Sequence, residues 1–167
     1  MAGTPNPEGV VEAAISVLTS DLPAKLLSLD SEYNDGITLA TVAKFWRNYA
    51  AQDQYDEVPA CIVTCSEGEI QFRTYRIYDH EFTIHYVFVG NDVISGFQPQ
   101  EVLTKRLQRT IRATIEILEN KPKLTISGSD YCDRFIVERV TYSDTFTDGQ
   151  EFRRDGLLTC LARTSTP

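Results

Sequence analysis

The sequence lacks the features that mark membrane, secreted and nucleotide-binding proteins. No apolar run approaches the roughly 18 residues that a membrane-spanning helix requires. The opening stretch, MAGTPNPEGVVEAA, has neither a basic region nor a long apolar region, so we expect no secretion signal and no membrane partner. The glycines are scattered singly and form no G-x-G-x-x-G or Walker-type loop, so no phosphate-binding loop is predicted.

Residues suited to catalysis or metal binding are also scarce. The two histidines, His80 and His85, fall on opposite faces of a predicted strand, and we expect both at the surface or at a sheet edge. No nucleophile elbow surrounds any serine or cysteine. Cys61 and Cys65 share one face of a predicted strand and are interpreted as small buried residues, because two cysteines do not complete a zinc site. We therefore predict no catalytic residue, no metal and no cofactor.

Size and charge further narrow the possible number of domains and the possible partners. The 167 residues suit one domain, residues 1–167, and are too few for two well-formed cores. A formal net charge of −8 argues against a protein that grips nucleic acid through its phosphates. The same charge suits a surface past which DNA slides without binding.

The spacing of apolar residues predicts an α+β fold. A helical part of about 8–51, with a helix divided at Pro23 and a further helix over 37–51, precedes a part with a sheet and a long helix at about 58–165. The long helix over 98–120 carries an apolar stripe: Leu103, Leu107, Ile111, Ile115 and Leu118. Strands are predicted at about 58–66, 70–90, 134–143 and 152–164. They are expected to form a mainly antiparallel four-stranded sheet with a long β-hairpin and the helix on one face.

The run TYRIYDHEFTIHYVFVG, Thr74–Gly90, is too long for one straight strand. With the four residues before it, the run would span roughly 65 Å as a strand, whereas a chain of this size has a diameter of about 40 Å. Apolar residues change parity near Tyr78–Glu81, which predicts a bulge, kink or loop there. We expect a core strand from about Glu81 to Val89, preceded by a twisted or projecting strand.

Two segments are candidate surfaces for binding a neighbouring subunit. The hairpin segment Gln71–Glu81 offers apolar and aromatic side chains, namely Phe72, Tyr75, Ile77 and Tyr78. The basic row of the long helix comprises Lys105, Arg106, Arg109 and Arg112. This row is either a solvated face with helical ion pairs, such as Arg112 with Glu116, or a patch that meets the acidic surface of another subunit.

The order of the predicted elements resembles that of tail-completion proteins of tailed bacteriophages, the tail terminator or minor tail protein U-like group of the neck. The resemblance rests on VPACIVTC, TYRIYDHEFTIHYVFVG, PQEVLTKRLQRTIRATIEIL and RFIVERVTYSDTFTDGQEFRRDGLLTCLART, roughly Val58 to Arg163. It implies a structural virion protein, assembled in the host cytoplasm, that forms a homo-oligomeric ring, usually a hexamer. The ring would cap the tail tube protein, face the head connector or adaptor proteins, and let genomic DNA pass through its lumen.

Other functions stay open on the residues alone. A head–tail adaptor or stopper protein of the neck is the close variant. A monomeric or dimeric module that binds a small molecule or peptide, and an accessory subunit of a host enzyme, belong to other classes. The mass in solution separates a ring from both of these classes.

Overall fold

The computed structural model describes residues 6–39, 41–47, 57–65, 71–74 and 77–165. Its helices are α1 (Pro7–Tyr33) and α2 (Pro99–Asn120). Its strands are β1 (Lys44–Arg47), β2 (Ala60–Cys65), β3 (Gln71–Thr74), β4 (Ile77–Gly90), β5 (Arg134–Tyr142), β6 (Phe146–Asp148) and β7 (Glu151–Ser165).

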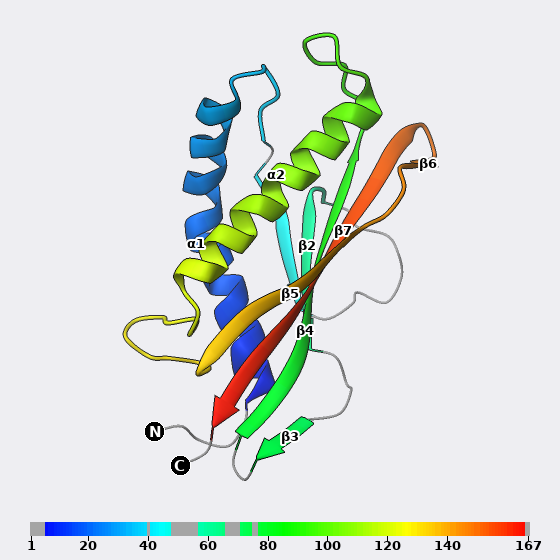
Figure 1. Ribbon diagram of the computed structural model, residues 1–167. Coiled ribbons are helices and arrows are strands. Elements are labelled where there is room, and N and C mark those ends of the chain that lie inside the picture. The colour runs from blue at the N-terminus through cyan, green and yellow to red at the C-terminus, as the bar shows by residue number, and fades with distance from the viewer. Residues whose placement is uncertain (1–5, 40, 48–56, 66–70, 75–76, 166–167) are drawn as a thin grey trace.

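The described strands form one mixed sheet in the order β1-β2-β4-β7-β5, with β3 added to β4 and β6 added to β7. Strand β1 runs parallel to β2, and the other neighbours are antiparallel. The longest pairing joins β4 to β7 (Figure 1). The α+β class is confirmed, and the sheet is mainly antiparallel as predicted, but the described residues form seven strands instead of four. The additional strands β1, β3 and β6 have only three or four residues each, too few to show an alternating pattern.

Both helices pack on one face of the sheet, which we call the helix-bearing face; the opposite face is called the open face. Figure 1 shows α1 and α2 side by side. The stripe of α2 lies on the sheet as predicted, with Leu107 and Ile111 fully buried in the main core cluster. The Tyr86 hydroxyl lies 2.7 Å from Thr114 Oγ1, and Thr114 donates to the Thr110 carbonyl, so this buried polar group of β4 is satisfied by α2.

Helix α1 continues through Pro23, so the predicted division into two helices is wrong. Proline lacks the N–H for a helical hydrogen bond and costs about 3 kcal/mol in a helix interior. Burial of Leu22, Leu26 and Leu29 around it offsets that cost, because each buried leucine contributes about 1.5–3 kcal/mol. Tertiary packing therefore overrides the local signal.

The helix predicted over 37–51 is also wrong where the structure describes it. Residues 44–47 form β1, which pairs with β2 in parallel. Phe45 packs against the main core, whereas Trp46 packs against Ile62 and Val87 on the open face. Side chains that point alternately to the two faces are typical of a strand. The four residues of β1 are too few to show the alternating pattern of a strand in the sequence. They form a strand because β2 is available for pairing.

The long aromatic run breaks earlier than the parity change predicted. Strand β4 pairs with β7 without interruption from Ile77 to Gly90, whereas β3 ends at Thr74 and pairs antiparallel with the start of β4. The predicted bulge near Tyr78–Glu81 is therefore wrong. His80 occupies the helix-bearing face there, and Asp79 is buried on the open face by its ion pair with Arg163. Polar side chains buried on both faces made the hydrophobic pattern misleading.

Truncating Leu107 or Ile111 to alanine is expected to lower the free energy of unfolding by about 2–5 kcal/mol. Both side chains pack against Gly156 of β7, where an added Cβ would lie 2.5 Å from Ile111 Cδ1 and 3.0 Å from Leu107 Cδ1. Gly156→Ala should therefore cost about 1–3 kcal/mol through overpacking. Urea unfolding should show that the double variant I111A/G156A loses less than the sum of the single losses, because the new methyl group fills part of the cavity.

Gly90→Ala is the matched control for this close approach. Its added Cβ would meet Leu103 at 3.7 Å, an ordinary contact, so we expect a loss below about 1 kcal/mol. Additive losses in I111A/G156A, or equal losses in the two glycine variants, would contradict the proposed packing of α2 on β7.

Candidate assembly surfaces

Each cation of the basic row has a carboxylate partner in its own chain. The pairs are Lys105–Asp35, Arg106–Asp92, Arg109–Asp35, Arg112–Glu32 and Arg112–Glu116. The pair of Arg112 with Glu116 lies within α2 and agrees with one of the two interpretations of the row, a solvated face with helical ion pairs. The acids of the other pairs come from outside α2: from the end of α1, from the turn after it and from the loop before α2. The row therefore fastens these segments to α2.

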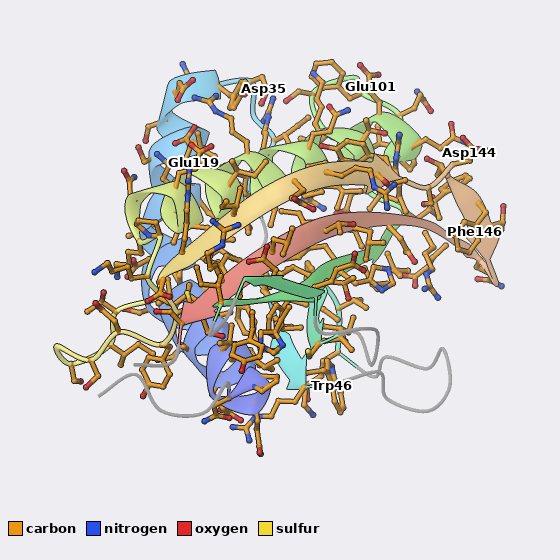
Figure 2. All side chains as sticks on the ribbon, turned by 60° about the horizontal axis from the view of Figure 1, so that its bottom comes forward. Asp35, Trp46, Glu101, Glu119, Asp144 and Phe146 are labelled. Carbon is orange, nitrogen blue, oxygen red and sulfur yellow. The ribbon has the colours of Figure 1, made fainter. Side chains whose placement is uncertain are left out.

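Arg109 and Asp35 form the centre of this network. The guanidinium makes two parallel hydrogen bonds to the carboxylate, of which Nη1 to Oδ1 is 3.0 Å, and it stacks 3.9 Å from the centroid of the Tyr33 ring. The hydrogen bond from Arg109 holds the pKa of Asp35 well below its usual range. Arg109 is buried, so its charge depends on this partner. Figure 2 shows Asp35 beyond the end of α1.

The turn that carries Asp35 is fixed by its own backbone contacts. Asn34 ends α1 in the left-handed region, and Gly36 has a φ of +82°, which favours glycine. Asp30 Oδ1 accepts a 2.9 Å hydrogen bond from the Leu39 amide.

The carboxylate partners neutralise the charge of the basic row within the subunit. Within the row, only Arg112 keeps a large exposed fraction, 41% of its side chain. Contact between the basic row and a neighbouring subunit stays a prediction. Arg112 is the residue of the row best exposed for such a contact.

The hairpin residues are partly built into the sheet. Ile77 and Tyr78 of β4 are half-buried and pair with both β3 and β7. Phe72 pairs through its backbone with Tyr78, and Tyr75 lies outside the described residues. The expected projection of the strand that precedes Glu81 is wrong for Ile77–His80, because β7 pairs along this whole stretch. Strand β3 lies beside β4, level with Ile77–Asp79 and on the side of β4 away from β7.

The open face carries a polar cluster that the sequence analysis did not find. His85 Nε2 lies 3.1 Å from Asp155 Oδ2, and Arg153 donates to both oxygens of the same carboxylate. Burial would raise the pKa of Asp155, but the hydrogen bonds from His85 and Arg153 outweigh it and lower the pKa. Seventy positions separate His85 from Asp155, and only the β4–β7 register brings them together. The cluster ties these strands together across the open face.

Both ends of the sheet expose an edge strand. No described strand pairs with the outer side of β1 or of β5. Along β5 and the adjoining β6, three large apolar side chains are exposed: Ile136, Tyr142 and Phe146. Figure 2 shows Phe146 and Trp46 at opposite edges of the sheet.

The β1 side has a groove of about 350 Å³ between α1 and residues 41–45. Leu18, Leu22, Val42 and Phe45 supply its apolar lining. The groove escaped the sequence analysis because a helix was predicted where β1 forms.

The described residues show no metal-binding constellation. No three His, Cys, Asp or Glu side chains gather within this part of the chain. Cys61 and Cys65 share the helix-bearing face as predicted, and burial raises the pKa of the Cys61 thiol to about 12. Neither described helix is both long enough and apolar enough to cross a membrane.

Comparisons with known proteins add no identification. The chain matches no family model, and a search of curated proteins found no significant match.

Replacing Asp35 by asparagine is expected to lower the free energy of unfolding at pH 7 by about 3 kcal/mol, because it leaves the buried Arg109 charge without its partner. Asp92→Asn is the matched control. Its partner is Arg106, but 57% of the Asp92 side chain is exposed, so we expect a loss below about 1 kcal/mol. Urea unfolding at neutral pH measures both.

The effect of D35N should also depend on pH. Because the pKa of Asp35 is lower in the folded chain, its stabilising effect is present above its ordinary pKa, about 4, and is lost as pH falls below that value. The difference between wild type and D35N should therefore shrink at acid pH. A constant difference from pH 7 to pH 3 would mean that the ion pair is not its cause.

His80 is buried on the central strand β4, contrary to the expectation of a surface or edge residue. Its Nε2 has no hydrogen-bond partner among the described residues, and its ring lies 6.4 Å from the Phe82 ring, centroid to centroid. Burial lowers the pKa of His80, although the nearby Asp79 carboxylate opposes the shift. The folded chain therefore favours the neutral imidazole.

His80 should make the protein less stable in mild acid. Its stabilising contribution is complete above the ordinary histidine pKa, about 6.5, and is lost as pH falls below this value, because the unfolded chain binds the proton more readily. His80→Leu should flatten the stability profile between pH 7.5 and pH 5, measured by urea unfolding. An unchanged profile would show that the folded protein accepts the proton without cost.

Proposed function

We propose that this chain is a structural virion protein of the tailed-bacteriophage neck, a tail terminator. Its subunits form a ring that caps the tail tube and joins it to the head connector. The observation that carries the proposal is the sheet with two dissimilar edges, β1 and β5, at its two ends. Two different edges on one subunit suit head-to-tail contacts, which form a ring when the rotation between successive copies closes.

The order of elements supports the proposal. The segments on which the resemblance rests form β2, β4, α2, β5 and β7, in that order along the chain. The ring is expected to be a hexamer, as the resemblance implies. The subunit would be assembled in the host cytoplasm and would then reside in the virion.

The charge of the chain suits a lumen that DNA traverses. The net charge is −8, and the four cations of the basic row are already paired with carboxylates of the same subunit. A ring of such subunits would repel phosphates rather than bind them. Genomic DNA is therefore a passing partner, while the tail tube protein and the head connector or adaptor are lasting ones.

A head–tail adaptor or stopper is the nearest variant and shares the same ring. A monomeric or dimeric binding module is the candidate from another class. The groove between α1 and residues 41–45 favours it, because apolar clefts of this size hold small ligands.

Light scattering after gel filtration, followed by electron microscopy, tests the proposal. We expect a mass several times the 18.8 kDa of the subunit and closed rings with a central lumen. Incubation with duplex DNA at physiological salt should give no retained complex. A monomer or dimer at all concentrations up to about 1 mM would contradict the ring.

A further inference from the structure

We infer that Tyr142, on the β5 edge of one subunit, inserts into the groove between α1 and β1 of the next subunit. This inference rests on the proposed ring and names its contact surface. The occupant of the groove is a second copy of this chain, joined head to tail.

The register of the sheet places Tyr142 and the groove at the same height along the strands. Successive partners across the sheet form one row: Phe45, Cys61, Tyr86, Gly156 and Tyr142. Phe45 lines the groove at one end of this row, and Tyr142 stands at the other end. If the strands run along the axis of a planar ring, successive subunits have no rise along that axis, so residues of equal height meet.

The two ends also share a face. Paired residues in a sheet project to the same side. Tyr86 of the row belongs to the core under the helices, so the row lies on the helix-bearing face. The groove lies between α1 and β1 on that same face. Tyr142, with 38% exposure, is an aromatic side chain of the kind that anchors interfaces.

Strand direction and charge agree with this contact. Following the pairings from β1 to β5 shows that the two edge strands run antiparallel, so the edges of successive copies suit antiparallel pairing. Lys44 is level with Ser143, because Ala60, Val87 and Asp155 link them across the sheet. The neighbouring Asp144 is exposed and would approach Lys44 of the next copy. Within one subunit these two charges stand at opposite edges of the sheet.

Two single variants test the two sides of the contact. Tyr142→Ala removes the anchor, and Thr19→Arg places a long charged side chain at the mouth of the groove, where Thr19 is exposed. Each should raise the concentration for half-maximal ring assembly by about thirtyfold or more, the effect expected of an interface anchor. Tyr131→Ala is the matched control, because Tyr131 is 40% exposed but lies outside the sheet edge; it should change assembly less than about twofold. Circular dichroism and thermal unfolding confirm that each variant is folded.

Mixing the variants gives a sharper readout. The Y142A subunit keeps a groove and the T19R subunit keeps a tyrosine, so an equimolar mixture has one compatible contact. It should form heterodimers of twice 18.8 kDa and no rings. The charge pair gives an independent check: K44E and D144K should each weaken assembly, and the double variant should restore it.

The outcomes distinguish this inference from the proposed function. Rings of wild type together with normal assembly of both Y142A and T19R would overturn the inference and leave the ring intact. Rings in the mixture, or a small molecule found in the groove by native mass spectrometry, would overturn it as well. A wild-type protein that forms no ring would overturn both.

Discussion

The antiparallel pairing of β4 with β7 is the constraint on which the other features depend. It runs from Ile77↔Ser165 to Gly90↔Phe152 and places two long strands at the centre of the sheet. It brings His85 to Asp155 and Asp79 to Arg163 on the open face. On the helix-bearing face it sets Gly156 beneath Leu107 and Ile111, where the missing side chain lets α2 approach closely. A slip by one residue would exchange the two faces and lose all of these contacts.

Electrostatics inside the subunit shapes what it can present to partners. The chain has an excess of acid, yet the cations of α2 are used to hold the turn after α1 rather than to form a positive surface. Arg109 is buried against Asp35 and Tyr33, so this pair stabilises the subunit through local structure. In the assembly that we propose, recognition of another copy would then fall to the edges of the sheet, where exposed apolar side chains and an apolar groove lie.

Some of this structure could be predicted from the sequence because the signals were long and periodic. The stripe of α2 gave the helix, its bounds and its buried face, since Leu107 and Ile111 repeat over several turns. The strands β2, β5 and β7 followed from apolar runs between turn residues. Pro23 was misleading because local helix propensity is weaker than the burial of Leu22 and Leu26.

The candidate surfaces were harder to predict, because each depends on partners distant in sequence. The basic row was visible, but its neutralisation by Asp35, Asp92 and Glu32 requires the packing of α1 and two loops against α2. The groove requires β1, whose four residues form a strand only because β2 is available for pairing. Tyr142 gains its significance from a row of partners across the sheet, which no local pattern encodes.

A sheet with two different edges also restricts how copies can associate. Joining two β5 edges, or two β1 edges, would satisfy one edge of each copy and leave the other exposed, which ends assembly at a dimer unless a second contact forms. Joining β5 to β1 satisfies both edges of every copy only when the chain of subunits closes on itself. Closure therefore follows from the same feature that makes each edge a liability in the isolated subunit. Tyr142 and the groove suit this arrangement, because an exposed aromatic side chain lies at the β5 edge and an apolar groove lies at the β1 edge.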